Sequence, residues 1–357
     1  MKDIIAFTKY SSKGPSSRYR TFQYIPYWQK NGYNVDVNIL FNDDYVERLY
    51  SGKSKKIISI INSYCKRIWK LMLLKNKGQI IWIEYELLPF VPPVLEKWLK
   101  WRKYKLILDF DDAIFHFYDK NPNIFISFIL GNKILNLVRN VNHVVTGSPY
   151  LTENIKRSQE IVSEIPTSIY YPTYDSKSSN SNDLTNEFII CWIGSKSTSY
   201  NVLHIKKGLE LFFEKYNAVI HLIGFDKKLE KELGQLNYKI IDWNEKTEID
   251  EIKKCTVGIM PLEYNDFNNG KCGFKLIQYM ACGIPTISTP LVANKKINRN
   301  NKNLYASTET EWFEQLKSIY LNDKKFKEIG NNNKEIIREH YNTDKNYVKY
   351  LQIFESI

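Results

Sequence analysis

Short apolar runs alternate with segments of helical length along this chain, and the alternation occurs twice. In the first half the runs are residues 4–8, 34–40, 79–85, 105–110 and 143–148. In the second half they are residues 188–195, 218–224, 239–243, 257–262 and 285–289. Strands that alternate with helices form parallel sheets covered by helices. We therefore predict an α/β protein of two Rossmann-like domains facing across a cleft, with ligands at the carboxyl ends of the strands.

A polar segment separates the two alternating halves. Residues 165–187, "IPTSIYYPTYDSKSSNSNDLTNE", are rich in Pro, Ser and Asn, which is typical of a linker. We place the first domain at residues 1–168 and the second at 169–343, with a linker at 169–187. A chain of 357 residues is long enough for two domains, each with its own core.

Cysteine usage and the absence of long apolar runs indicate a cytoplasmic protein. The five cysteines are odd in number, widely spaced and lack a C-x-x-C pattern. This argues against a disulfide framework or a zinc ribbon and favours a reducing compartment. The apolar run at the N-terminus is too short for a signal peptide, and no run reaches the roughly 18 residues of a membrane span.

The net charge of +12 is concentrated in the first half, since residues 1–165 carry an excess of ten positive charges. Residues 53–77 hold eight basic side chains and no acidic one, and residues 98–105, "WLKWRKYK", interleave tryptophan with cations. One interpretation is a surface that rests on anionic lipid. The other is a pair of ordinary amphipathic helices with solvated lysines. Nucleic-acid binding is disfavoured because no recognition motif accompanies the charge.

The segment "NNGKCGFKLIQYMACGIPTIST", residues 268–289, predicts an anion-binding helix N-terminus. Its first turn carries Lys271 and Lys275, although cations are unfavourable where the backbone already presents partial positive charge. A bound diphosphate would make them favourable, because Gly270 and Gly273 leave backbone N–H groups accessible. Gln278 shares their side of the helix. The alternative is that both lysines are simply solvated.

Two other loops suit the same ligand. The loop "SSKGPSSRYR" after the first strand contains Gly14 and Arg18, and "IGSKSTSY" contains Gly194, Ser195, Lys196 and Thr198. Neither matches a Walker loop or the G-x-G-x-x-G pattern of dinucleotide binders, and each could also be a polar turn. Glu263 precedes the lysines and is a candidate contact for the non-phosphate part of the ligand, or an ordinary loop residue.

Carboxylates follow two neighbouring strands of the first half: Glu84, Glu86, Asp109, Asp111 and Asp112. Parallel neighbouring strands bring such groups to one edge of the sheet. A carboxylate there can orient or deprotonate a sugar hydroxyl, with Asp111 and Asp112 as the catalytic candidates and the other three on the acceptor side. The alternative is that Asp111 or Asp112 caps a helix.

The stretch "GKCGFKLIQYMACGIPTISTP" resembles the helix of the group 1 family of retaining, nucleotide-sugar-dependent glycosyltransferases, which have the GT-B fold. "IGSKST" and "NNKNLYASTETEW" support the likeness, and "LDFDDAIF" resembles a subgroup that builds capsule, O-antigen and lipopolysaccharide. The likeness implies a C-terminal helix, residues 344–357, that completes the first domain. It also implies transfer with retention, without a metal or a cofactor, and a nucleotide sugar as a substrate.

The sequence departs from the family pattern at two places. Where relatives typically have two glutamates, the chain has Gly270 and Gln278, and Gln278 cannot carry a charge. The family's Gly-Arg and Lys pair after the first strand of the second domain is replaced by Ser195 and by Tyr200 or Asn201. We expect Lys271 and Lys275 to supply the missing positive charge and to act as catalytic residues that stabilise the leaving diphosphate. This leaves the acid that contacts the sugar unassigned.

These inferences lead to a glycosyltransferase that moves a sugar from a nucleoside diphosphate to a hydroxyl of a bacterial surface glycan, free or lipid-linked. We expect it at the inner face of the cytoplasmic membrane, with an anionic lipid surface and no nucleic acid as partner. The rivals are a metal-dependent transferase with "DFDD" as its Asp-x-Asp site, a nucleotide-sugar epimerase, and a non-enzymatic module that binds membranes or nucleic acid.

Overall fold

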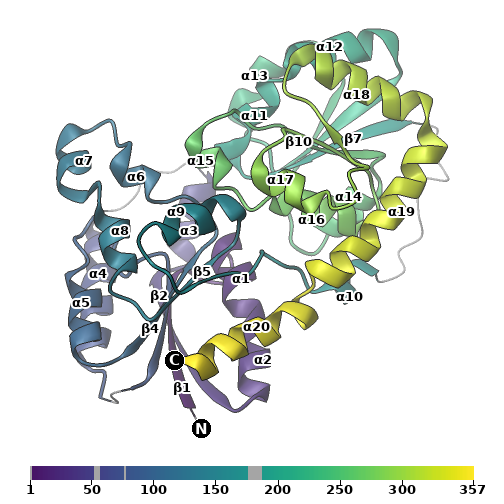
Figure 1. The fold of residues 1–357 in the computed structure, drawn as a ribbon. Helices are drawn as coiled ribbons and strands as arrows, with labels where there is room; N and C mark the ends of the chain where they lie inside the picture. The colour runs from purple at the N-terminus through teal and green to yellow at the C-terminus, as the bar shows by residue number, and fades with distance from the viewer. Residues whose placement is uncertain (1, 52–56, 76–77, 176–186) are drawn as a thin grey trace. The chain divides into compact units, whose positions relative to one another are not determined.

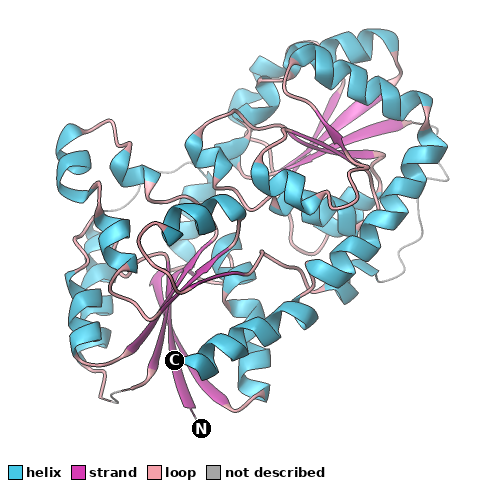
Figure 2. Ribbon diagram, viewed as in Figure 1, coloured by secondary structure: helices cyan, strands magenta, loops and turns pink. Residues whose placement is uncertain are grey.

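The computed structural model describes residues 2–51, 57–75, 78–175 and 187–357. The chain divides into two compact units (Figure 1). Unit 1 comprises Met1–Ser168, Asn269–Cys272 and Thr343–Ile357, and unit 2 comprises Ile169–Asn268 and Gly273–Asn342. Both are α/β structures with helices packed around a sheet (Figure 2). Most of the predicted linker, residues 176–186, and parts of the basic segment, residues 53–56 and 76–77, lie outside the described residues.

Within its described residues, unit 1 has a six-stranded parallel sheet in the order β2-β1-β3-β4-β5-β6. The strands are β1 (Lys2–Tyr10), β2 (Tyr33–Phe41), β3 (Ile80–Glu84), β4 (Lys105–Phe110), β5 (His143–Thr146) and β6 (Val162–Glu164). After β2 the chain returns to the other side of β1 to form β3. The carboxyl ends of β1 and β3 therefore flank a topological switch point, where open α/β sheets bind ligands.

Helices cover both faces of the sheet of unit 1, so its strands alternate between two cores. Ile81 and Ile83 of β3 face one core, and Ile80 and Trp82 face the other. The helices are α1 (Pro15–Arg20), α2 (Ile25–Lys30), α3 (Asp43–Ser51), α4 (Ile57–Met72), α5 (Val94–Trp101), α6 (His116–Asp119), α7 (Ile124–Leu130), α8 (Lys133–Val138), α9 (Pro149–Lys156) and α20 (Thr343–Ser356). Burial on both faces explains why these strands read as continuous apolar runs.

The last helix completes the second core of unit 1. Tyr350 and Phe354 of α20 contact the rings of Trp28 and Trp82, with ring centroids 5.2–6.3 Å apart. All four rings are fully buried or nearly so. The structure therefore groups α20 with unit 1.

Unit 2, over its described residues, has a six-stranded parallel sheet in the order β12-β11-β10-β7-β8-β9. The strands are β7 (Phe188–Ile193), β8 (Ala218–Ile223), β9 (Tyr238–Ile241), β10 (Val257–Met260), β11 (Thr286–Ser288) and β12 (Leu304–Tyr305). When β7 to β12 are numbered 1 to 6, the sheet read from β9 to β12 has the Rossmann order 3-2-1-4-5-6. Its switch point lies between β7 and β10.

The helices of unit 2 are α10 (Tyr171–Asp175), α11 (Tyr200–Leu203), α12 (Lys206–Lys215), α13 (Glu230–Leu233), α14 (Glu248–Lys253), α15 (Asp266–Asn269), α16 (Phe274–Ala281), α17 (Val292–Ile297), α18 (Glu309–Leu321) and α19 (Asp323–His340). The longest well-capped one is α18, which begins at a capping box formed by Thr308 and Glu311. Its Trp312 and Leu316 pack into the core beside Ile190 and Leu222 of the sheet.

The α/β prediction is confirmed, with one more strand in each sheet than the sequence indicated. The unpredicted strands, β6 and β12, have three and two residues, too few to show a period. The units divide between Ser168 and Ile169. The sequence did not indicate that Asn269–Cys272, just before α16, packs with unit 1.

Candidate functional site

A glycine loop follows β7 at the switch point of unit 2. A Cβ on Gly194 would lie 2.5 Å from the ring of Trp192 and 2.9 Å from the Thr198 hydroxyl, so only glycine fits. Gly224, which follows the neighbouring β8, has a φ of +77°, and a Cβ there would lie 2.2 Å from the Gly194 carbonyl oxygen. The two loops thus touch through their backbones, which keeps side chains away from the end of β7.

The polar residues after Gly194 form a closed turn. The Ser195 and Thr198 side chains make a capping box around the short 3₁₀ helix Lys196–Thr198, and the Thr198 amide donates to the Ser195 carbonyl at 2.9 Å. The Ser199 hydroxyl accepts from the amide of Asp226 at 2.9 Å. Lys196 lies exposed on the outside of the turn. The Ser195 and Thr198 side chains, which were predicted to contact a ligand, therefore stabilise the conformation of the loop.

Helix α16 begins at Gly273, whose φ of +68° is left-handed. A Cβ there would approach Ile297 to 2.4 Å and the Asn294 side-chain oxygen to 3.0 Å. The first turn contains no acidic residue, and the N-cap residue is a glycine, which has no side chain with which to cap the helix. The N-terminus of such a helix carries partial positive charge that attracts anions.

Tyr279 fixes α16 against the two strands that flank the switch point. Its hydroxyl accepts from the amide of Ile193 in β7 at 2.9 Å and donates to the carbonyl of Ile259 in β10 at 3.2 Å. The ring is fully buried and lies where a Cβ on Gly258 would come within 2.3 Å. Burial raises the pKa of Tyr279 far above its usual value, so the hydroxyl stays protonated.

The remaining predicted donor-side residues of unit 2 lie in different surroundings. The Lys275 ammonium lies over the Trp192 ring, 5.2 Å from its centroid. Gln278 is buried, and its amide is 3.5 Å from the Tyr174 hydroxyl of α10. Glu263 is exposed and accepts from the side chain of Asn265 at 3.1 Å. The Lys275 ammonium, carried by the first turn of α16, thus lies over the same Trp192 ring that adjoins Gly194.

A buried carboxyl, Glu84, ends β3 at the switch point of unit 1. The Ser17 hydroxyl donates to its two oxygens at 2.6 and 2.9 Å, and the Lys9 amide donates at 3.2 Å. Burial raises the pKa of Glu84 to about 8, against the hydrogen bond from Ser17, which lowers it. The group is therefore mostly protonated at neutral pH, and it ties α1 to β1 and β3.

Tyr85, the next residue, has a φ of +63° and places its hydroxyl on Asp111. The same hydroxyl lies 3.2 Å from the hydroxyl of Ser16. Left-handed backbone costs a non-glycine residue about 1–3 kcal/mol and is found at functional sites. Burial and the neighbouring Asp112 raise the pKa of Asp111 to about 6, against lowering by Arg20, Ser16 and Lys271.

Lys271 belongs to this carboxylate cluster. Its ammonium lies 3.3 Å from Asp112, and both side chains remain about a quarter exposed. The flanking residues hold the segment in place: the Cys272 thiol donates to the Asp111 carbonyl at 2.7 Å, and the Ser148 hydroxyl donates to the Gly270 carbonyl at 3.2 Å. A Cβ on Gly270 would lie 2.4 Å from the Cβ of Ala113, so only glycine fits at this position.

Two of the predicted acceptor-side carboxylates are enclosed in structural networks. Asp109 accepts a bidentate pair from Arg20 at 2.5 and 2.9 Å, and both side chains are buried. Arg20 also donates to the Ile165 carbonyl at 2.7 Å. Glu86 is buried against the ammonium of Lys133 and the hydroxyl of Tyr118, the latter at 2.7 Å. These groups stabilise the loops after β3 and β4 and do not present free oxygens.

The loop after β1 is shaped by Gly14, where a Cβ would lie 2.5 Å from that of Tyr10. Gly14 precedes α1, and Arg18 of that helix stacks on the Tyr19 ring with its guanidinium 4.8 Å from the centroid. With six residues, α1 is a short helix, and the sequence prediction of a phosphate contact here stays a prediction.

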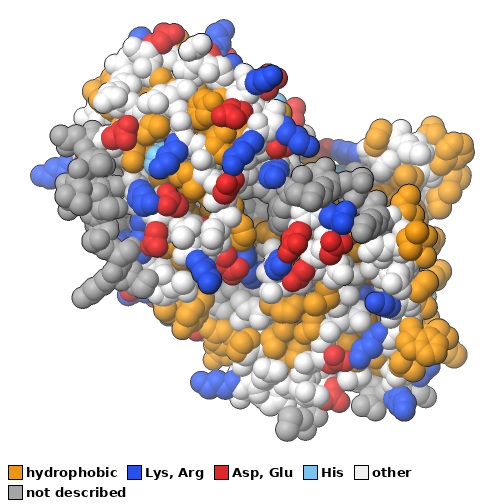
Figure 3. All heavy atoms as spheres, turned by 180° about the vertical axis from the view of Figure 1, so that it is seen from behind, with side chains coloured by type: hydrophobic (Ala, Val, Ile, Leu, Met, Phe, Trp, Pro, Cys, Tyr) orange, Lys and Arg blue, Asp and Glu red, His pale blue; other side chains and the backbone are white. Residues whose placement is uncertain are grey.

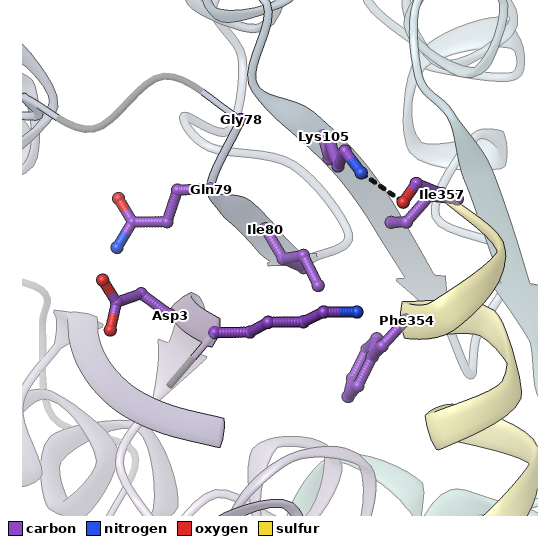
Figure 4. A pocket seen from close by; sticks show the side chains of 8 residues that line it. Asp3, Gly78, Gln79, Ile80, Lys105, Phe354 and Ile357 are labelled. Atoms are coloured by element: carbon purple, nitrogen blue, oxygen red, sulfur yellow. Dashed lines mark hydrogen bonds between the residues drawn. The ribbon is translucent and has the colours of Figure 1, made fainter. Parts of the chain in front are cut away.

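Figure 4 shows a cavity of about 250 Å³ at the opposite edge of the sheet of unit 1. It is lined by Lys2, Asp3, Gly78, Gln79, Ile80, Lys105, Phe354 and Ile357, and the Lys105 ammonium donates to the Ile357 carbonyl. Ligands of parallel sheets bind at the carboxyl ends of strands. This cavity lies at the amino ends, so we assign it no role in the reaction.

The described residues lack both a cluster of metal ligands and a membrane-spanning helix. They contain no group of three or more His, Cys, Asp or Glu side chains that could hold a metal ion. Among the described helices, none has the length and apolar character that crossing a bilayer requires.

Comparisons with known proteins agree with this geometry. Residues 187–322 match the model of the family described as "Glycosyl transferases group 1". The structure is similar to that of HepE from Anabaena in complex with UDP and glucose, with a TM-score of 0.74, 12% identity, and coverage of 99% of this chain and 100% of the other. It is also similar to a glycosyltransferase from Rickettsia africae, with a TM-score of 0.69, 14% identity, and coverage of 99% and 98%.

A third similar structure is WaaG, a glycosyltransferase involved in lipopolysaccharide biosynthesis, with a TM-score of 0.68, 12% identity, and coverage of 98% and 99%. The chain has the GT-B fold. A comparison with curated protein sequences gives no match.

Within this GT-B framework the structure separates residues that the sequence had grouped. Lys271 and Lys275 were predicted to bind one diphosphate; in the structure Lys271 pairs with Asp112 in unit 1, and Lys275 lies over Trp192 in unit 2. Asp111 and Asp112 do lie in one cluster, and neither caps α6, which begins after Phe115.

Sequence reasoning missed the residues that position the site: Ser17, Arg20, Tyr85 and Tyr279. Arg20 ends α1, a segment for which the sequence indicated only phosphate contacts. Tyr85 adjoins Glu84 at the end of an apolar strand, where a tyrosine looks like core. The signal for Tyr279 is Gly258, a glycine inside a buried strand, which indicates close approach of another group.

Proposed function

We propose that this protein is a glycosyltransferase that uses a nucleoside diphosphate sugar, with unit 2 holding the nucleotide. The observation that carries the proposal is the switch point between β7 and β10. There, two glycines that tolerate no side chain, Gly194 and Gly273, border the start of α16. This arrangement lies in the segment that matches the group 1 family, and similar structures hold UDP.

In this proposal α16 and Lys275 bind the donor diphosphate. The helix N-terminus offers backbone N–H groups and partial positive charge, and the ammonium adds a full charge next to them. Negative charge develops on the diphosphate as it leaves the sugar. Cationic and dipolar groups aimed at that charge lower the barrier, typically by a few kcal/mol for each group. Gly194, Ser195, Lys196, Thr198, Glu263 and Gln278 remain predicted donor contacts around them.

Unit 1 supplies the groups that act on the acceptor. Asp111 has a pKa near 6, so it is ionised at neutral pH yet basic enough to accept a hydroxyl proton. The Tyr85 hydroxyl orients its carboxylate. We propose Asp111 as the residue that activates or orients the acceptor hydroxyl, with the Asp112–Lys271 pair adjusting the local charge.

The finer features remain proposals drawn from the likeness to group 1 enzymes. They are transfer with retention, independence of metal ions, and a bacterial surface glycan as the acceptor, lipid-linked and offered at an anionic cytoplasmic membrane surface. Support for metal independence comes from Asp109, because both oxygens of this first aspartate of "DFDD" are bound to Arg20. Support for the membrane comes from the positive charge of the first half.

The test is a thermal-shift panel of UDP-, GDP- and dTDP-sugars, run on the wild type and on Gly273→Val. A ligand that binds only the folded state raises the melting temperature of the wild type. The variant, whose side chain would collide with Ile297, should show no shift with the same compound. The active sugar is then assayed for transfer with and without EDTA. No shift with any nucleotide sugar would reject the proposal, and loss of transfer in EDTA would reject metal independence.

A further inference from the structure

One side of unit 1 exposes far more apolar surface than a water-soluble helix layer requires. Figure 3 shows hydrophobic side chains gathered along the side of unit 1 that carries α4, α5 and α7 in Figure 1. Exposed single apolar residues are ordinary, but contiguous patches mark sites of interaction. Two helices, α7 and α4, contribute most of this surface.

Helix α7 turns its apolar residues outward. Its sequence is "IFISFIL", and Ile124, Phe125, Phe128 and Ile129 are 67–89% exposed. Only Leu130 is buried in the core, with Ile126 partly buried against it. The helix is nevertheless well formed, because the Asn123 side chain caps it and the Ser127 hydroxyl donates to the Asp119 carbonyl. A capped helix with exposed phenylalanines is built to meet an apolar partner.

Helix α4 is apolar on a second face besides the one that packs inward. Tyr64, Ile68 and Leu71 pack into the core of unit 1. The second face carries Ile58, Ile61, Trp69 and Met72, at spacings of three, eight and three residues, and each is more than half exposed. An ordinary surface helix has polar residues there.

The charges around this surface match an anionic partner. Over residues 57–75 and 78–142, the exposed acidic residues are limited to Asp119, which pairs with His116. The same residues expose the cations Lys66, Lys75, Lys97, Lys100, Lys103, Lys120 and Arg139. Apolar side chains bordered by lysines, with aromatic rings among them, fit the boundary between lipid headgroups and acyl chains.

We propose that this side of unit 1 is a bilayer-docking surface, in which α7 and the outer face of α4 enter the lipid interface while the lysines contact anionic headgroups. The proposal sharpens the membrane association included in the proposed function, but it does not depend on transferase activity. Its occupant is a lipid surface, and the alternative occupant, a second copy of this chain, is an outcome of the test.

The experiment measures co-flotation of the full chain with vesicles of phosphatidylcholine alone and vesicles in which about a third of the lipid is phosphatidylglycerol. The wild type should float with the anionic vesicles. Phe125→Ser with Phe128→Ser should lower the partition coefficient about 100-fold, because two exposed phenyl rings no longer enter the interface. Trp69→Ser with Ile58→Ser should act in the same direction, and both pairs are exposed, so folding is preserved.

Matched controls carry the same kinds of change outside this surface. Leu321→Ser removes an exposed apolar side chain of unit 2, and Lys231→Glu reverses an exposed charge there. Both should float like the wild type, whereas Lys66→Glu with Lys97→Glu should lose binding to the anionic vesicles. A wild type that does not float, or surface variants that float as well as it does, would overturn the proposal.

Sedimentation equilibrium tests the alternative occupant, a second copy of this chain. A wild-type dimer that the α7 variant converts to monomer, without any binding to vesicles, would assign the surface to self-association instead. The UDP-induced thermal shift is measured on every variant as a separate readout. Docking variants should keep it, so failure of the docking surface is distinguishable from failure of the donor site.

Discussion

The two units carry different chemical groups at the switch points of their parallel sheets. In unit 2 the switch point is bordered by glycines, a helix N-terminus and Lys275. In unit 1 it is bordered by carboxyl groups, namely Glu84 and Asp111. A sheet of this kind directs ligands to the carboxyl ends of its strands whatever they are, and the side chains there decide which ligands fit.

The difference also shows in what burial does to charge. Unit 1 buries several ionisable groups deeply, and two of its buried ion pairs are Arg20–Asp109 and Lys133–Glu86. The described part of unit 2 builds its switch point mainly from backbone, hydroxyl groups and the phenol of Tyr279. Unit 1 should therefore respond to pH and to charge substitutions, and unit 2 to substitutions that add atoms. The following experiments test this division.

The largest effect is expected from Asp111→Asn. The variant keeps the hydrogen bond with Tyr85 but loses the base, so transfer should fall about 10²–10⁴-fold while the fold persists. Wild-type turnover should also decline as the pH falls below about 6, where Asp111 becomes protonated. Asp112→Asn is the control and should lose less. Equal losses in the two variants would remove Asp111 from the role of base.

Arg20→Met should destabilise unit 1 by about 3–5 kcal/mol, because it leaves the carboxylate of Asp109 buried without a partner. The exposed Arg48–Asp44 pair supplies the control, since Arg48→Met should cost less than about 0.5 kcal/mol. Hydrogen exchange during urea titration measures both units. Protection from exchange should drop in β4 and stay unchanged in β7. An equal loss of protection in both strands would contradict the view that the stability of each unit can be changed separately.

Glu84→Gln should alter the pH dependence of stability. The folded pKa of Glu84 is raised from 4.5 to about 8, so the folded state holds a proton that the unfolded state has released between these values. Stability of the wild type therefore falls as the pH rises through this window, by at most about 1.4 kcal/mol per pH unit from this group. The variant should lack this decline in urea denaturation. Parallel pH curves for the two proteins would show that Glu84 is ionised when folded.

The smallest effects separate the two lysines. Lys275→Gln should weaken UDP binding about tenfold, as expected for the loss of one charge-assisted contact. Lys271→Gln should leave UDP affinity unchanged, because its ammonium pairs with Asp112 in unit 1. Calorimetric titration with UDP measures both. Equal losses of affinity in the two variants would show that both lysines contact the donor, as the sequence alone suggested.

The fold could be predicted from the sequence because burial on both faces makes strands such as β3 and β7 continuously apolar. Their number could not, since β12 has only two residues. The glycines at the switch point were also visible, because Gly194 and Gly273 stand where an apolar run changes to a helix.

The pairing of side chains could not be predicted. Spacing along the helix that the sequence predicts places Lys271 near Lys275, but it cannot show that the chain at Asn269–Cys272 packs with unit 1 before α16 begins. Asp109 and Asp111 are equivalent in the sequence. Asp109 lies within β4, and its side chain points to the face of the sheet where Arg20 lies. Asp111 follows the last residue of β4 and so lies at the edge of the sheet. Such differences depend on contacts between residues more than 80 positions apart.

The route of the chain through unit 1 limits how the two halves can be studied in isolation. A fragment that stops at Ser168 would lack α20, and the indoles of Trp28 and Trp82 would lose the rings of Tyr350 and Phe354 that cover them. Such a fragment should aggregate. Dissection of this protein calls for a circular permutant that joins the last helix to the first strand, or for supplying the helix as a separate peptide.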